Sequence, residues 1–309
     1  MQHTLRSVAR FSGIGLHTGR QVRMVIHPAA ADSGIRFRRT DVPTGSGVSA
    51  DIPALWNAIA PSNLCTRIAN SDGVSVSTIE HVMAALAGCG IHNARVDVDG
   101  PEVPVLDGSA APIVDALLTA GIRQLAAPLQ VLRVLRPVEV RDGCAVARLE
   151  PAASLQMAFE IEFGARAIGH QALEMDLGGS AFVRMLSDSR TFCLQSDVDS
   201  MRASGLARGG SYHNAVVFDG DRVLSPGGLR HADEPVRHKM LDAIGDLALA
   251  GAPLLGRYVG HRAGHALTGQ LLAKLFSTPG AAERLYCDAA CARGLPGMTA
   301  QREGLQLSA

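Results

Sequence analysis

Two segments far apart in the chain combine helix-forming residues with apolar positions that could pack against a core. The first covers residues 78–86. The second begins at Pro235 and ends before a glycine–proline breaker at residues 251–253. Its apolar positions are Met240, Leu241, Ile244 and Leu247. Proline near the start of such a run and glycine with proline after it are typical helix boundaries. The pattern therefore predicts one helix in each segment.

Apolar runs predict strands and further helices around these two segments. Expected strands cover residues 21–27, 35–39 and 94–99 in the first half of the chain, and 138–141, 157–163 and 254–259 in the second. Helices are expected at residues 111–120 and 265–276, and the pattern lapses at 121–130, as in a linker.

Each half thus begins with strands and continues as helix, strand and helix. The two histidine-bearing helices also match weakly in sequence, residues 80–88 against 237–245. This repetition predicts an α+β fold with a duplicated unit: two related two-layer α/β sandwich domains, residues 1–126 and 127–309. Clefts between domains are common ligand sites, so we expect an active site at the junction.

Composition narrows the class of protein. The chain has 309 residues, 47% of them apolar, which is enough for a substantial core. Its 29 acidic and 29 basic residues balance, which argues against a nucleic-acid partner. No apolar run reaches membrane-spanning length, so we expect no transmembrane segment and a cytoplasmic monomer. The six scattered cysteines are expected to be reduced thiols.

The second of the two helices carries a row of polar side chains. His238, Asp242 and Asp246 are spaced by four residues and share one helix face. An imidazole and a carboxylate one turn apart can hold two corners of a divalent metal. His81, on the other helix, follows an acid, Glu80. Two histidines, an aspartate and a free glutamate are the components of a zinc hydrolase site.

Each residue of this set has an expected role. His81, His238 and Asp242 would be the metal ligands, and Glu80 would take a proton from water. Asp246 would orient His265, whose cation would stabilise an oxyanion.

Less specific interpretations exist for the same residues. A single histidine on an apolar helix is most often structural, and His238 with Asp242 could be an ordinary helix pair. Spacing by itself does not join the two helices. His17 lies between glycines that permit a tight loop near a ligand.

Longer motifs specify a family. They are Gly13-Ile14-Gly15-Leu16-His17-Thr18-Gly19, Ser77-Thr78-Ile79-Glu80-His81, Pro104-Val105-Leu106-Asp107-Gly108-Ser109-Ala110, Ser189-Arg190-Thr191-Phe192, Val236-Arg237-His238-Lys239-Met240-Leu241-Asp242 and Gly264-His265-Ala266-Leu267. With these motifs the chain resembles the UDP-3-O-acyl-N-acetylglucosamine deacetylases, the LpxC family of zinc amidases in lipid A biosynthesis. The resemblance covers residues 5–275.

The resemblance implies roles beyond those suggested by the spacing. It implies that Thr191 hydrogen-bonds the oxyanion and that Lys239 faces the anionic substrate. Phe163 would pack near the nucleotide, and Arg262 stands where the family commonly has lysine. An insert at residues 192–212, which includes Phe192, would form an apolar passage for the acyl chain; without the resemblance it reads as a plain surface helix. Further substrate contact is expected from His17.

The resemblance implies a metal-dependent hydrolase that removes acetate from a UDP-linked, 3-O-acylated N-acetylglucosamine. The cofactor would be Zn²⁺, with Fe²⁺ as an alternative that such ligand sets also accept. Either Glu80 or His265 would protonate the leaving amine. Two other functions stay open at this stage: a zinc amidohydrolase acting on a different N-acyl sugar, and an inactive paralogue that binds sugar nucleotides.

Overall fold

The first half of the chain forms a five-stranded sheet covered by two helices. The structure is a computed structural model and describes residues 1–43, 45 and 47–297. The strand order is β2 (Ala9–Ile14), β3 (Gln21–Pro28), β9 (Ala94–Val98), β4 (Ile35–Arg39) and β5 (Asp51–Pro53). The helices are α1 (Glu80–Gly88) and α2 (Ala111–Ala120). The helix predicted to carry His81 is therefore present.

The second half forms a larger sheet with its own pair of helices. Its strands include β12 (Val138–Asp142), β13 (Ala145–Glu150), β19 (Leu254–His261), β14 (Leu155–Glu162) and β15 (His170–Asp176), in that order across the sheet. Two more strands, β11 (Gln130–Val134) and β20 (Ala282–Tyr286), extend it beside β19. The helices are α5 (Glu234–Leu247) and α6 (His265–Ser277).

The two sheets share one topology. In the first, β9 lies between antiparallel β3 and parallel β4. In the second, β19 lies in the same way between antiparallel β13 and parallel β14. In each half a helix, α1 or α5, precedes this central strand. The predicted α+β fold with a duplicated unit is confirmed at this level. The boundary between residues 126 and 127 stays a prediction.

The remaining elements are short. They are β1 (His3–Leu5) with β10 (Ile122–Gln124), a sheet of β6 (Ile59–Ala60), β7 (Arg67–Ala69) and β8 (Ser75–Ser77), a sheet of β16 (Phe192–Leu194), β17 (Val216–Asp219) and β18 (Arg222–Val223), helices α3 (Ala181–Met185), α4 (Gln195–Ala203) and α7 (Ala289–Arg293), and the 3₁₀ turns η1 (Trp56–Ala58) and η2 (Ala248–Ala250). The predicted linker thus contains β10, which pairs with β1. Within the described residues, no helix has both the length and the apolar character to cross a membrane.

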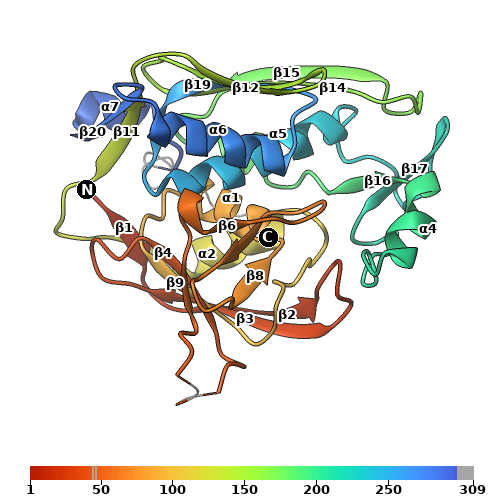
Figure 1. The fold of residues 1–309 in the computed structure, drawn as a ribbon, viewed down its shortest axis with the longest axis horizontal. Coiled ribbons are helices and arrows are strands. Elements are labelled where there is room, and N and C mark those ends of the chain that lie inside the picture. The colour runs from red at the N-terminus through yellow and green to blue at the C-terminus, as the bar shows by residue number, and fades with distance from the viewer. Residues whose placement is uncertain (44, 46, 298–309) are drawn as a thin grey trace.

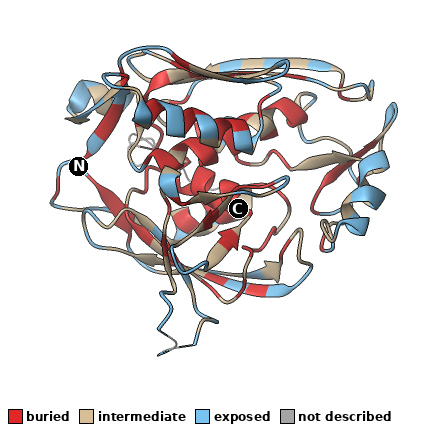
Figure 2. Cartoon of the chain, viewed as in Figure 1, coloured by how far each residue is buried: buried red, intermediate tan, exposed pale blue. Residues whose placement is uncertain are grey.

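The helices of both halves meet between the two sheets. Figure 1 shows α5 and α6 beneath the upper sheet and α1 and α2 above the lower one. In Figure 2 helices α1 and α5 are mainly buried, whereas α2 and α6 bury only part of their surface. One apolar cluster extends through both halves. Gly245 of α5 lies directly against the start of α1, and a Cβ atom there would be 2.0 Å from the carbonyl oxygen of Glu80. Only glycine permits this approach of the two backbones.

We therefore expect Gly245→Ala to destabilise the protein by about 1–3 kcal/mol, because the added methyl group forces α1 and α5 apart. Gly269→Ala on α6 is the matched control. Its Cβ atom would meet Ile59 at 3.4 Å, an ordinary contact, and alanine favours the helix by up to about 1 kcal/mol. Urea unfolding measures both effects. Equal stability of the two variants would contradict the proposed constraint.

Candidate metal centre and active site

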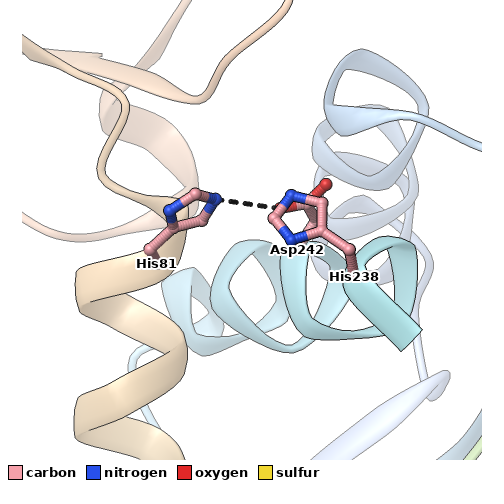
Figure 3. A group of neighbouring side chains, drawn as sticks. All are labelled: His81, His238 and Asp242. Carbon is pink, nitrogen blue, oxygen red and sulfur yellow. Dashed lines mark ion pairs between the residues drawn. The ribbon is translucent and has the colours of Figure 1, made fainter. Parts of the chain in front are cut away.

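Three side chains from the two halves converge where α1 meets α5. His81 lies at the start of α1, and His238 and Asp242 are one turn apart on α5. One ligand atom of each lies within 4.8 Å of the other two. The Nε2 atoms of His81 and His238 are 3.5 Å and 3.2 Å from Asp242 Oδ1. Figure 3 shows His81 pointing across to the other two side chains.

The chemistry of this trio fits a divalent metal. All three side chains are buried, and Asp242 Oδ1 has no hydrogen-bond donor among the described residues. The Ser189 carbonyl accepts a hydrogen bond from His238 Nδ1 at 3.0 Å, which leaves Nε2 as the atom with a lone pair. Burial lowers the pKa of His238 to about 4, so its imidazole is neutral, as ligation requires. Two imidazoles and a carboxylate suit Zn²⁺ or Fe²⁺.

The Glu80 carboxylate lies beside this trio and is buried. The side chain is 4% exposed, and its Oε2 atom accepts a hydrogen bond from the backbone N–H of Thr66 at 2.9 Å. Burial raises the pKa of the Glu80 carboxyl group above its usual range. A raised pKa suits a group that accepts a proton and later returns it.

A third histidine of the site, His265, faces Glu80 from α6. His265 Nδ1 is 2.9 Å from Asp246 Oδ2, and its Nε2 atom is 3.9 Å from Glu80 Oε1. Burial opposes protonation of this imidazole, but the charges of Asp246 and Glu80 outweigh it and raise the pKa of His265 to about 9. His265 is therefore a cation at neutral pH, held against the reaction site by Asp246.

Thr66 joins these groups and was not identified from the sequence. Its hydroxyl donates to Asp246 Oδ1 at 2.5 Å while its N–H binds Glu80. Glu80 belongs to the same half of the chain as Thr66, whereas Asp246 belongs to the other half and lies 180 residues after Thr66. No local pattern marks Thr66, which lies just before the short strand β7. Ser189 belongs to one of the family motifs, but the sequence predicts no role for it.

The His–His–Asp trio, Glu80 and His265 line a cavity of about 1020 Å³. The other residues predicted to contact substrate also line it: His17, Phe163, Thr191, Phe192, Lys239 and Arg262. Lys239 Nζ donates to Asp242 Oδ2 at 3.0 Å, next to the metal trio. Asp246 is the exception among the predicted site residues, since it lies behind His265 and outside the cavity wall.

The predicted substrate residues differ in their surroundings. The rings of Phe163 and Phe192 are edge to face with centroids 5.4 Å apart. The buried Nε2 atom of His17 has no partner among the described residues. Arg262, in contrast, is partly exposed and pairs with Glu162. The cavity lining thus includes a half-buried aromatic pair and an exposed arginine.

The segment predicted as an insert forms one wall of the cavity. It consists of β16 and α4, which lie to one side of the layered body in Figure 1. Helix α4 has no buried residue, yet Leu194, Val198 and Met201 line the cavity. Leu206, which also lies within the predicted insert, does not line it. An exposed helix with one apolar face toward a cavity is suited to hold an apolar chain.

The fold and this site together define a metalloenzyme of the hydrolase class: a His–His–Asp trio, a buried carboxylate and a cationic histidine share one cavity. The comparisons with known proteins agree. Residues 2–277 match the family model described as UDP-3-O-acyl N-acetylglycosamine deacetylase, LpxC, and the chain belongs to this family.

Curated relatives carry the same description. A UDP-3-O-acyl-N-acetylglucosamine deacetylase of Phenylobacterium zucineum is 51% identical over 280 residues, which cover 91% of this chain and 94% of that protein. The protein of that name from Shewanella baltica is 44% identical over 278 residues, covering 89% and 90% of the two chains. The similarity thus extends over nearly the full length of these relatives.

Removal of one ligand tests the metal centre. We expect the wild-type protein to bind about one equivalent of Zn²⁺ and His238→Ala to retain less than about a tenth of it, because two side chains do not complete the site. His27→Ala is the control, since His27 pairs with Asp97 on the five-stranded sheet of the first half and does not line the cavity. Metal analysis after dialysis measures all three proteins. Full metal content in His238→Ala would exclude His238 as a ligand.

Proposed function

We propose that this protein hydrolyses the 2-acetamido group of UDP-3-O-acyl-N-acetylglucosamine and releases acetate, a step of lipid A biosynthesis. The observation that carries the proposal is the trio of His81, His238 and Asp242 inside a cavity with an apolar wall, in a chain of the deacetylase family. Family membership does not favour the two alternatives left open by the sequence.

The cofactor in this proposal is Zn²⁺, with Fe²⁺ as a substitute, held by His81, His238 and Asp242. A divalent ion in such a site supplies a Lewis acid and lowers the pKa of water. Lys239 donates to Oδ2 of Asp242, and the other oxygen, Oδ1, faces His81 and His238. The protein part of the reaction then depends on the groups around these ligands.

Glu80 acts as the general base. The Thr66 N–H fixes one oxygen of its carboxylate, so the other oxygen, on the side of His265, takes the proton from the attacking water. His265, kept cationic by Asp246, stabilises the negative charge that develops on the amide oxygen, and the Thr191 hydroxyl donates to the same charge. The leaving amine takes its proton from either Glu80 or His265, whose Oε1 and Nε2 atoms are 3.9 Å apart.

The substrate is divided between polar and apolar regions of the cavity. Lys239 and Arg262 provide positive charge for the diphosphate, and His17 offers its unpaired Nε2 atom to a polar group. Phe163 packs near the nucleotide, and Phe192 with the insert at residues 192–212 encloses the acyl chain. Apolar side chains of α4 favour that chain by removing it from water.

Replacement of the base provides a direct test. Glu80→Gln keeps the size of the side chain and removes its ability to accept a proton, so we expect kcat to fall roughly 10²–10⁴-fold. Metal content should stay at the wild-type level, because Glu80 is not among the three ligands. Acetate release and metal analysis on the same preparation measure the two effects. Near-normal turnover would exclude Glu80 as the base.

The proposed acyl-chain contact with α4 can be tested separately. Val198→Asp places a charge where the acyl chain would lie, and we expect KM for the 3-O-acylated substrate to rise about tenfold or more, an unfavourable change of about 1.4 kcal/mol. Ser196→Asp adds the same charge to an exposed position of α4 that does not line the cavity. Steady-state kinetics of both variants, with substrate bearing or lacking the acyl chain, test this. Equal effects on both substrates would contradict an acyl site at α4.

A further inference from the structure

The row of polar side chains on α5 begins one turn earlier than the spacing of His238, Asp242 and Asp246 indicated. Glu234 is four residues before His238, on the same helix face. Its side chain is 1% exposed, which is rare for glutamate outside an ion pair or a metal site. It is not one of the three ligands and does not line the cavity.

Glu234 is bound almost entirely by one residue of another segment, Arg190. Its Oε1 atom accepts hydrogen bonds from both the backbone N–H and Nε of Arg190, each at 2.9 Å. Its Oε2 atom accepts from Arg190 Nη2 at 3.1 Å and from the Arg230 N–H at 2.7 Å. Arg190 Nη2 also donates to the Gly228 carbonyl at 2.7 Å. The carboxylate therefore fixes the backbone of residue 190 as well as its guanidinium group.

Residue 190 stands between two groups of the site. On one side, the Ser189 carbonyl accepts the hydrogen bond from His238 Nδ1. On the other, Thr191 lines the cavity. The segment is thus attached to α5 twice, one helical turn apart: Glu234 holds the N–H of Arg190, and His238 holds the carbonyl of Ser189. Two anchors on one rigid helix determine where that carbonyl and the Thr191 hydroxyl lie.

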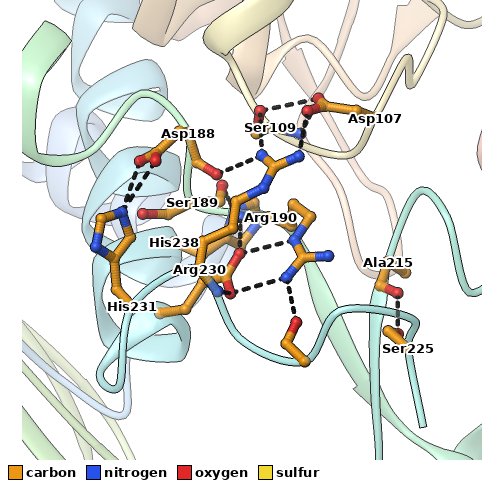
Figure 4. A network of polar contacts seen from close by, with 12 residues as sticks. Asp107, Ser109, Asp188, Ser189, Arg190, Ala215, Ser225, Arg230, His231 and His238 are labelled. Carbon is orange, nitrogen blue, oxygen red and sulfur yellow. Dashed lines mark hydrogen bonds and ion pairs between the residues drawn. The ribbon is translucent and has the colours of Figure 1, made fainter. Parts of the chain in front are cut away.

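Contacts with the first half of the chain complete the attachment. The Thr191 N–H donates to the Gly108 carbonyl at 2.8 Å. Arg230 donates to Asp107 Oδ2 of the first half at 2.9 Å and, within its own half, to the Asp188 carbonyl at 2.6 Å. Figure 4 shows Arg190 and Arg230 beside Ser189 and His238. Movement of this segment would therefore disturb the junction of the two halves as well as the site.

A buried ion pair is a poor source of stability, since apolar residues of similar volume often replace one without loss. What the pair between Glu234 and Arg190 provides is geometry: a guanidinium group and a carboxylate meet in a fixed planar arrangement. A metal-bound histidine depends on such outer partners, because the bond at one ring nitrogen sets the tautomer and direction of the other.

We propose that the ion pair of Glu234 and Arg190 is a positioning element that holds the Ser189 carbonyl on His238 Nδ1 and the Thr191 hydroxyl in the cavity. The first part concerns metal affinity alone. The second part rests on the proposed deacetylase function.

Zinc affinity tests the first part without any assay of activity. Glu234→Gln keeps the shape of the side chain but turns an NH₂ group toward donors of Arg190 or Arg230. We expect the Kd for Zn²⁺, measured by competition with a chelator, to rise about 10- to 100-fold. Arg190→Lys keeps the charge without the two-point geometry, and its Kd should lie between those of the wild type and Glu234→Gln.

A second readout follows His238 itself. Long-range ¹H–¹⁵N spectra of the metal-free protein should show a single His238 tautomer in the wild type, with the ring proton on Nδ1. In Glu234→Gln they should show a mixture of the Nδ1–H and Nε2–H tautomers. Asn93→Ala is the control for a general loss of stability, because buried Asn93 bonds Gly34 and Gln2, none of which lines the cavity. It should lower the free energy of unfolding and leave Kd and the tautomer unchanged.

The outcomes separate the two proposals. Unchanged Kd and tautomer in Glu234→Gln, with stability reduced as in Asn93→Ala, would overturn the positioning role. If Glu234→Gln does not fold, Arg190→Lys decides the question by the same two readouts. For Thr191, metal-loaded Glu234→Gln should lose kcat with little change in KM, as expected for a transition-state contact. A wild-type protein that binds zinc and lacks deacetylase activity would refute the proposed function and leave the metal part intact.

Discussion

The close contact of α1 with α5 is the constraint on which the rest of the site depends. Gly245 lets the backbone of α5 touch the carbonyl of Glu80, and this contact sets the distance between the two halves at their centre. Glu80 and His81 begin α1, while His238 and Asp242 occupy the preceding turns of α5. The same contact therefore determines whether ligand atoms from separate halves fall within 4.8 Å of one another. A wider crossing would preserve both helices and separate the side chains of the His–His–Asp trio.

Charge is the second constraint, because three carboxylates are buried close together. Glu80, Asp242 and Asp246 are each at most 5% exposed, and repulsion among them would destabilise the folded state without partners. Each carboxylate has a hydrogen-bonding or charged partner. The Thr66 N–H binds Glu80, Lys239 binds Asp242, and His265 binds Asp246. The partners come from a loop, α5 and α6, so the cluster is stable only when all of these elements are packed.

Much of the fold could be predicted from the sequence, since helices and strands follow local apolar spacing. The strand expected at residues 35–39 and the helix expected at 111–120 agree with β4 and α2 as observed. The pattern at residues 121–130 predicts a linker, but β10 lies within it. That strand pairs with β1 at the start of the chain, and a partner so distant leaves no signal in the local pattern.

For the site, the sequence by itself determined which side chains share a helix face, because the helical period fixes the positions of residues four apart. His238, Asp242 and Asp246 could be grouped in this way, and the motifs of the family added Thr191 and Lys239. Only the tertiary structure decided that His81 meets that face, that Thr66 binds both Glu80 and Asp246, and that Glu234 holds Arg190. These contacts join residues far apart in the chain, and their distances depend on how whole layers pack rather than on any local preference.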